Sequence, residues 1–297
     1  MRLVFHLPAP RRSSTLTLPQ LLDLAGTAEE LGIAAVAASD HPFPVVARGA
    51  PAHHTYDPFV LLSLVAARTS RVQLLFSLLV APYRNPFLTA SMLATLDAGC
   101  AGRVVAGLGA GYVRSEFDAL GASYADRSGQ TAATARAMRA AWTGQPVQLA
   151  GEGWTARGNT LRPVPPAGHE IPLWRGGNSR LAVAQAAREF SGWMPFEVAE
   201  EWAGSAATAA ATVRTLRDRV ERYRAAHAHH HPDRSPAVCF VRTDPGWTRD
   251  EGRAVDEIGQ LAEAGVTWLE SGSAGRSAGE VRDDLHRFVA CHSAARP

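Results

Sequence analysis

Short apolar runs alternate along the chain with segments whose apolar residues recur at helical spacing. Residues 72–80 form a nearly unbroken apolar run, typical of a strand that is buried on both faces. Asn85-Pro86 then provides a cap and a first-turn proline for a helix over residues 87–98, and residues 104–108 form the next apolar run. This order predicts two parallel strands joined by a helix.

The same alternation extends over the whole chain and predicts eight strands that alternate with helices. Strands are expected at residues 2–7, 33–38, 72–80, 104–108, 171–175, 192–194, 237–243 and 266–271. Helices are expected at residues 17–31, 57–69, 87–98, 131–142, 176–190, 206–227, 250–264 and 278–291. Residues 144–168 are rich in Gly and Pro with little periodicity, which indicates an insertion after the fourth strand.

Eight strand–helix units in about 300 residues predict an α/β fold, a (β/α)8 TIM barrel that forms a single domain over residues 1–297 with an insertion at about 144–170. A doubly wound open sheet is the alternative. The even spread of the eight units favours a closed barrel.

Composition narrows the class of protein without naming a function. Of the 297 residues 46% are hydrophobic and 20% charged, which is ordinary for a globular protein, and a net charge of +2 gives no case for nucleic acid or an anionic membrane as partner. No stretch reaches the roughly 18 apolar residues of a membrane span, and the first apolar run is too short for a signal peptide. Cys100, Cys239 and Cys291 are odd in number and far apart, which predicts free thiols in a cytoplasmic protein.

In a TIM barrel the loops that follow the strands build the active site. Asp40-His41 follows the second predicted strand, where a histidine can exchange a proton near neutral pH while a carboxylate orients it. The alternative is a helix-capping Asp beside a surface His, and position alone favours neither. His6 after the first strand and Tyr112 after the fourth are further candidate proton donors.

Two glycine-rich turns lie at the same predicted mouth. Gly176-Gly177-Asn178-Ser179 opens a helix whose free N–H groups and positive dipole end suit a phosphate, although an ordinary N-cap would look the same. Residues 107–111 (GLGAG) lack the GxGxxG spacing of a dinucleotide fingerprint. We expect these glycines to let a flat ring or a phosphate approach the backbone.

Four histidines lie in the segment HAHHHPD, at positions 227, 229, 230 and 231. Metal binding would need further Cys or carboxylate ligands, and no such pattern accompanies them. The segment is therefore interpreted as a solvated helix end that runs into a Pro-Asp turn, and no metal site is predicted.

An ordered set of segments resembles the luciferase-like monooxygenase superfamily, and within it the branch that depends on the deazaflavin coenzyme F420. The matching segments are AEELGIAAVAASDH, the stretch from residue 56 to residue 121, RAAWTGQPV and IPLWRGGNSRLAVAQAAREFSGWMP. They cover about residues 20–195 in family order, and the last hundred residues match only as a continuation of the barrel.

The resemblance implies a TIM barrel with an insertion, usually dimeric, with the cofactor across the mouth. It implies that Asp40 contacts the deazaflavin and that His41 lies near its hydride-accepting carbon. A bulge with a non-proline cis peptide would fall at Ser77-Leu78 and back the ring. The residues implied to bind the cofactor are Asp40, Ser77, Leu78, Val80, Ala110, Gly111, Gly176, Gly177, Asn178, Ser179 and Arg180.

The chain also departs from the family pattern. Where many relatives have Gly-Thr before the bulge it has Leu75-Phe76, which predicts a narrower ring pocket. A sugar-phosphate dehydrogenase of the family has a Glu where Tyr112 stands and a Trp where Val45 stands. No cluster of lysines marks a sugar-phosphate site, so oxidation of a sugar phosphate is not carried over.

The leading hypothesis is an F420-dependent oxidoreductase that moves a hydride between the deazaflavin and a small organic substrate and reduces a C=C or C=N bond. Asp40 would bind the cofactor, His41 would relay the proton, and Tyr112 or His6 would be a second donor. One alternative is an FMNH2- and O2-dependent monooxygenase, with FMN as cofactor. The other is a barrel that binds a flavin-like ligand without turnover.

Overall fold

Eight parallel strands close into a barrel in this computed structural model, which describes all residues except 11–13, 46–53, 167, 204–207 and 296–297. The order around the barrel is β1-β10-β9-β8-β7-β4-β3-β2. The strands are β1 (Arg2–His6), β2 (Ala35–Ala38), β3 (Gln73–Val80), β4 (Val104–Gly109), β7 (Leu173–Gly176), β8 (Gly192–Met194), β9 (Ala237–Val241) and β10 (Trp268–Ser271). The predicted TIM barrel is confirmed.

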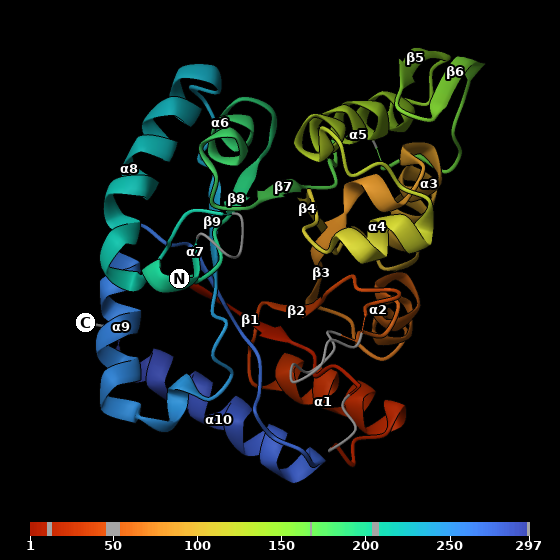
Figure 1. The fold of residues 1–297 in the computed structure, drawn as a ribbon. Coiled ribbons are helices and arrows are strands. Elements are labelled where there is room, and N and C mark those ends of the chain that lie inside the picture. Colours follow the sequence, from red (N-terminus) through yellow and green to blue (C-terminus); the bar gives the residue numbers. More distant parts are fainter. Residues whose placement is uncertain (11–13, 46–53, 167, 204–207, 296–297) are drawn as a thin grey trace.

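Helices surround this barrel (Figure 1). They are α1 (Leu18–Glu30), α2 (Pro58–Ala66), α3 (Pro86–Gly99), α4 (Arg114–Leu120), α5 (Arg127–Trp142), α6 (Arg180–Glu189), α7 (Glu200–Ala203), α8 (Val213–His230), α9 (Glu251–Glu263) and α10 (Ala278–Ala294). Local sequence signals start several of them: Thr17 and Ser277 form capping boxes, and Asp57 and Asn85 cap α2 and α3 ahead of a first-turn proline. None of the described helices is both long and apolar enough to cross a membrane.

Several segments differ from the prediction, among them the three that follow. The helix expected from residue 206 begins only at Val213, because Thr212 caps it through a capping box with Thr215; residues 204–207 lie outside the described residues. Helix α4 was missed because it is only seven residues long and Val113 provides no side-chain cap. The insertion contains an antiparallel hairpin, β5 (Val147–Gly151) and β6 (Trp154–Asn159), whose mostly exposed strands carry no clear alternation.

The core has two layers, which follow from the alternation of side chains along each strand. Among the described residues, a cluster of nine buried hydrophobic side chains lies inside the barrel, and in it Trp174 meets Trp268 edge to face at 5.3 Å. A larger cluster fills the space between the sheet and the helices. Leu75 belongs to the inner layer and Phe76 to the outer one, where its ring lies 4.9 Å from that of Phe59. The apolar side chains fill the barrel interior of the described residues, so a ligand site would lie at an end of the barrel and not inside it. That the chain forms one domain stays a prediction.

Candidate active site

A cavity of about 850 Å³ lies at the carboxyl end of the barrel strands. Its walls come from the ends of β2, β3, β4, β7, β8 and β9 and from the residues that follow them. Most of the predicted site residues line it, namely Asp40, His41, Ser77, Leu78, Val80, Ala110, Gly111, Tyr112, Gly176, Gly177, Asn178 and Ser179. Two do not, because His6 lies beneath the cavity and Arg180 is exposed at the start of α6.

His41 is held in the cavity wall by a buried carboxylate. Its Nδ1 lies 2.8 Å from Oε2 of Glu116, which is fully buried in α4. The same carboxylate accepts hydrogen bonds from the Tyr83 hydroxyl at 3.2 Å and from the backbone N–H of Phe43 at 3.3 Å. Burial and the negative charge of Glu116 raise the pKa of Tyr83, so its hydroxyl stays protonated and donates. These contacts fix the orientation of the His41 ring.

Tyr112 stands beside this pair at the rim of the cavity. Its ring meets the His41 ring edge to face at 5.8 Å, and 55% of the residue is exposed. Burial of the hydroxyl and the charge of Glu116 raise the pKa of Tyr112, so it remains neutral at physiological pH. A neutral phenol at this place can donate a hydrogen bond.

Asp40 is committed to contacts within the protein. It is 2% exposed, and its carboxylate forms a two-pronged ion pair with Arg84, in which Nη2 lies 2.8 Å from Oδ1. Oδ2 also accepts the backbone N–H of Val80 at 3.0 Å. Asp40 does not cap a helix, since α2 is capped by Asp57. Contact with a cofactor stays a prediction, and the geometry gives Asp40 a positioning role at the end of β3.

The end of β3 carries the bulge that the resemblance implied. The peptide bond between Ser77 and Leu78 is cis, and the pairing of β3 with β4 shifts register between Phe76 and Leu79. The Ser77 hydroxyl donates to both oxygens of the buried Glu270, at 2.8 Å each.

His6 joins the network beneath the bulge. Its Nδ1 lies 2.7 Å from Oε1 of Glu270, and its Nε2 lies 3.2 Å from the hydroxyl of Ser39, which lines the cavity. His6 thus contacts the cavity wall through Ser39 while remaining outside the cavity lining. Its role as a second proton donor stays a prediction.

The mouth glycines make room for Leu78. A Cβ added at Gly107 would lie 2.7 Å from the Leu78 side chain. For a Cβ added at Gly109 or Gly176, the nearest atom would belong to the Leu78 side chain. At Gly111, which has a positive φ of 74°, a Cβ would meet Val80 and Phe117. The missing side chains at these glycines therefore leave room for the protein's own Leu78, Val80 and Phe117. That residues 107–111 also let a ring or a phosphate approach the backbone stays a prediction, and Gly109 and Gly111 line the cavity.

Two other expectations change in detail. Leu75 and Phe76 do not line the cavity, so they do not narrow it directly as the sequence suggested. Asn178 lines the cavity, but its amide donates to the backbone carbonyls of Phe196 and Ala209 and accepts the N–H of Phe196. This side chain joins the loops after β7 and β8.

Arg175 is a buried cation that sequence reasoning missed. It is the penultimate residue of β7, it is 1% exposed, and it lines the cavity. Its Nε donates to Oε1 of Gln185 at 3.0 Å and its Nη1 donates to the Gly176 carbonyl, but no carboxylate of the described residues lies within 4.0 Å. Burial lowers the pKa of Arg175 to about 10, so it is charged at neutral pH. The sequence signal that could have indicated this site is a single charged residue, Arg175, in an otherwise apolar predicted strand.

The surroundings of Arg175 suit an anion. The N-terminus of α6 begins beside it, capped by Ser179, whose hydroxyl accepts the N–H of Ala182. Arg127 and Ser128 from the first turn of α5 line the same cavity. A buried charge without a carboxylate partner is costly unless a ligand compensates it. We call Arg175, Arg127, Ser128 and Ser179 the anion corner.

No cluster of three or more His, Cys, Asp or Glu side chains with metal-binding geometry occurs in the described part of the chain. The histidines of the HAHHHPD segment lie at the C-terminal end of α8, where ring contacts join His227 to His231 and His229 to His230.

A parallel barrel with a cavity of polar and apolar side chains at its carboxyl mouth defines the chain as a TIM-barrel protein of the kind that carries ligand sites at that end. The chain belongs to the luciferase-like monooxygenase family, whose model matches residues 1–289.

Similar proteins include F420-dependent glucose-6-phosphate dehydrogenases. That of Rhodococcus erythropolis is 31% identical over 182 residues, which are 59% of this chain and 52% of that protein. The enzyme of Nocardia farcinica is 30% identical over 182 residues, which are again 59% of this chain and 52% of that protein. The chain spans about half the length of the curated relatives it matches.

Solved structures share the fold at lower identity. An F420-dependent secondary alcohol dehydrogenase in complex with an F420-acetone adduct aligns with a TM-score of 0.77 at 17% identity, over 100% of this chain and 99% of that one. A monooxygenase from Streptomyces bottropensis aligns with a TM-score of 0.76 at 19% identity, over 98% of both chains. At such identities the likeness concerns the fold alone.

Proposed function

We propose that this chain is an F420-dependent oxidoreductase that transfers a hydride between the deazaflavin and a small organic substrate, with reduction of a C=C or C=N bond as its reaction. The observation that carries the proposal is the layout of the mouth cavity. One wall contains Arg175, a buried cation with no carboxylate partner among the described residues. Another wall contains His41, whose ring is oriented by the carboxylate of Glu116. The F420-dependent relatives support the choice of cofactor.

The residues present fit a phosphate-bearing cofactor. The anion corner would hold the phosphate, since a buried guanidinium, a helix N-terminus and two hydroxyl groups converge there. The Ser77-Leu78 bulge would back the ring. When bound, the deazaflavin supplies a ring carbon that accepts or gives a hydride.

The reacting proton would be handled by this chain's own side chains. Glu116 holds Nδ1 of His41, which fixes the tautomer and the ring plane that face the cavity. Tyr112, a neutral phenol at the rim, is the second candidate donor. Arg84 and Asp40 hold the end of β3 in place beneath them.

The cavity lining favours a substrate other than a sugar phosphate. The sequence contains no lysine, and Tyr112 and Val45 stand where the sugar-phosphate enzyme of the family has acidic and indole side chains. Tyr112 lines the cavity, and Phe43 and Val45 are more than half exposed in the segment that follows His41, which suits an apolar substrate. The buried, unpaired cysteines accord with a reducing, cytoplasmic setting.

The test is a titration with F420 and, separately, with FMN, followed by cofactor fluorescence. We expect micromolar binding of F420 and weak binding of FMN. Arg127→Gln should weaken F420 binding about tenfold, because it removes one charge-assisted hydrogen bond. Arg157→Gln, the same charge change on the exposed β6, should leave it unchanged.

Other outcomes of the titration contradict the proposal in distinct ways. Tighter binding of FMN, with oxygen consumed when reduced FMN is added, would make the chain a monooxygenase. Binding of F420 with no redox change for any substrate would leave a ligand-binding barrel. Binding of neither would reject the cofactor assignment.

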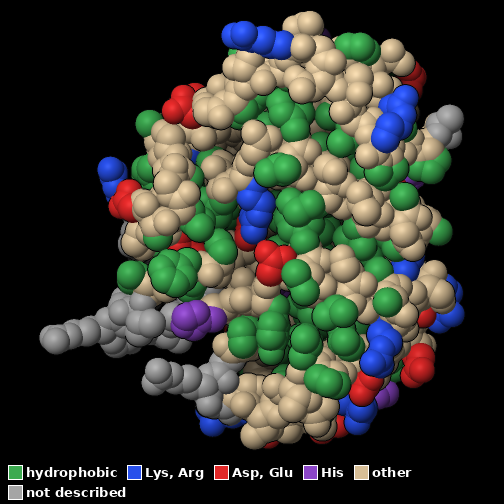
Figure 2. All heavy atoms as spheres, turned by 90° about the vertical axis from the view of Figure 1, so that its right-hand side faces the viewer, with side chains coloured by type: hydrophobic (Ala, Val, Ile, Leu, Met, Phe, Trp, Pro, Cys, Tyr) green, Lys and Arg blue, Asp and Glu red, His purple; other side chains and the backbone are tan. Residues whose placement is uncertain are grey.

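We also propose that the chain forms a homodimer through α2 and α3. Val60 and Leu64 on α2, and Leu88 and Met92 on α3, are exposed and lie four residues apart on each helix. The two helices contact one another, and hydrophobic side chains gather on the face that includes them (Figure 2). A second copy with the same patch would cover it around a two-fold axis.

Leu88→Glu should convert the dimer to a monomer. The symmetric interface would bury the new charge twice without a partner, which weakens association by about 100-fold or more. Light scattering after gel filtration should give twice the 31.7 kDa chain mass for the native protein and once that mass for the variant. Leu181→Glu on the exposed face of α6 is the matched control and should remain dimeric. A monomeric native protein would contradict the proposal.

A further inference from the structure

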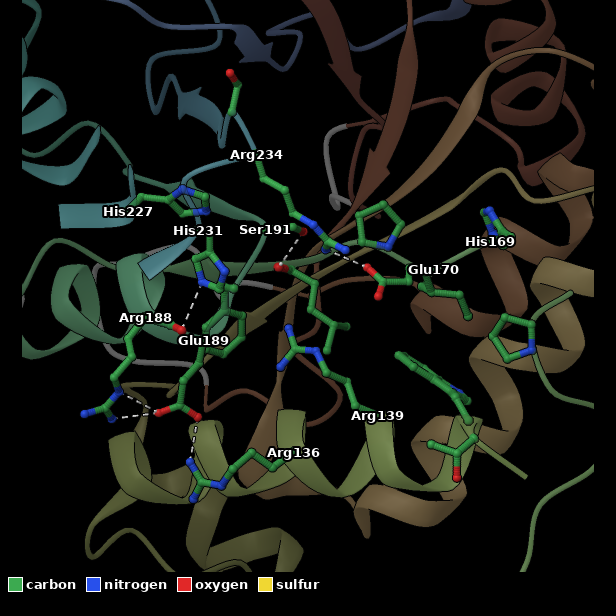
Figure 3. A pocket seen from close by; sticks show the side chains of 18 residues that line it. Arg136, Arg139, His169, Glu170, Arg188, Glu189, Ser191, His227, His231 and Arg234 are labelled. Atoms are coloured by element: carbon green, nitrogen blue, oxygen red, sulfur yellow. Dashed lines mark hydrogen bonds and ion pairs between the residues drawn. The ribbon is translucent and has the colours of Figure 1, made fainter. Parts of the chain in front are cut away.

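A second cavity, of about 1040 Å³, lies at the amino ends of β7, β8 and β9, opposite the mouth. Figure 3 shows its lining side chains from close by. It is bounded by the C-terminal halves of α5, α6 and α8 and by the residues that lead into β7, β8 and β9. Among the described residues, none lines both this cavity and the mouth cavity. Nothing in the proposed oxidoreductase chemistry uses it.

Positive charge converges on this cavity from several elements. Arg136 and Arg139 come from α5, Arg188 from α6 and Arg234 from the loop before β9. The lining also contains two acidic side chains, Glu170 and Glu189.

Both carboxylates are already engaged by arginines. Glu189 lies 2.6 Å from Nη1 of Arg136 and 2.7 Å from Nη2 of Arg188, and Glu170 lies 3.0 Å from Nη1 of Arg234 (Figure 3). These pairs leave a net positive charge on the lining.

Arg139 is the cation that remains. It makes no hydrogen bond and no ion pair within 4.0 Å with any residue that the structure describes, although the charges of Glu170 and Glu189 act on it from farther away. Its guanidinium lies 5.7 Å from the ring of Phe190. Figure 3 shows it rising from α5 into the cavity. An unpaired guanidinium fork over an aromatic floor is suited to a planar anion.

Helix dipoles explain part of this charge. Arg139 and Arg188 lie in the last turns of α5 and α6, where cations are favourable. Arg136 lies one turn earlier, and Arg234 is not in a helix. A helix dipole favours charge and gives no reason for an apolar wall. The apolar part of the lining, which includes Trp142, Ile171, Leu173 and Phe190, is therefore a separate feature of the cavity.

We propose that this cavity binds a small organic anion, with a phosphate or carboxylate group on Arg139 and an apolar body against the aromatic and aliphatic floor. The ion-paired arginines around it would add outward N–H donors. The site is separate from the mouth and does not depend on which cofactor binds there.

The probes are phenyl phosphate, phthalate and inorganic phosphate, titrated calorimetrically into the full chain at fixed ionic strength. We expect one-to-one binding of phenyl phosphate or phthalate, about tenfold tighter than that of inorganic phosphate because only the aryl anions bury an apolar body. A preference between the two aryl anions would identify the charged group. Absence of binding by both would overturn the proposal.

Variants locate the binding. Arg139→Gln should weaken the tighter aryl anion about tenfold or more, Arg139→Lys should have an intermediate effect, and Arg157→Gln should have none. Arg139 is exposed, so we expect these variants to fold, which circular dichroism checks. If Arg127→Gln lost binding of the aryl anion while Arg139→Gln kept it, the anion would bind at the mouth, and the proposal would be overturned.

Discussion

Replacing His41 with alanine should cut turnover by about 10²- to 10⁴-fold while the affinity for the cofactor stays within a few-fold. Turnover should fall without a matching loss of cofactor affinity because the two depend on different walls of the cavity. His41 is oriented by Glu116, whereas the phosphate would be held in the anion corner. Single-turnover absorbance of the cofactor measures the chemical step, and the fluorescence titration measures binding.

Glu116→Gln tests whether the carboxylate acts through His41. It preserves the size of the side chain but keeps one oxygen, which can accept from either the Tyr83 hydroxyl or the Phe43 N–H, and it removes the charge that holds Nδ1. We expect a smaller loss, mainly in kcat, with KM little changed. Partial rescue of His41→Ala by added imidazole would mark a missing proton carrier. Turnover of His41→Ala equal to that of the native protein would remove His41 from the mechanism.

The barrel and the location of its mouth could be predicted because they follow from local signals. Apolar runs mark strands that helices cover on one side and the barrel interior fills on the other, as at residues 72–80. Asp40 and His41 directly follow a strand, so chain order alone places them at the mouth. The position of a residue at a strand end follows from the local sequence and does not depend on contacts with distant parts of the chain.

Glu116 and Arg175 could not be assigned because their roles depend on distant parts of the chain. Glu116 reaches His41 across 75 residues of sequence, through the short helix α4 that local propensity did not reveal. Arg175 looks like the polar end of a strand, and only the folded barrel shows that no carboxylate of the described residues accompanies it. The packing around the mouth glycines could not be predicted for the same reason, since Leu78 and Val80 reach the space beside them from β3.

Asp40→Asn should destabilise the protein by about 3 kcal/mol and abolish tight cofactor binding with it. Asn keeps the shape of the side chain and an oxygen for the Val80 N–H, so the substitution isolates the charge that pairs with Arg84. Arg84 is only 19% exposed at its side chain, and without Asp40 its nearest remaining carboxylate is Asp57, at 3.7 Å. An uncompensated, mostly buried guanidinium at the end of β3 would displace the Ser77-Leu78 bulge, which we propose backs the ring.

Urea unfolding of Asp40→Asn and of Asp57→Asn separates this role from direct contact with the cofactor. Asp57 is 48% exposed and Asn is an equally good helix cap, so its replacement should cost less than about 1 kcal/mol. If Asp40→Asn kept native stability and still lost F420, the carboxylate would act on the cofactor directly, as the family resemblance implied. If it lost both, the ion pair would hold the bulge in place, and cofactor binding would depend on Asp40 through the geometry of β3.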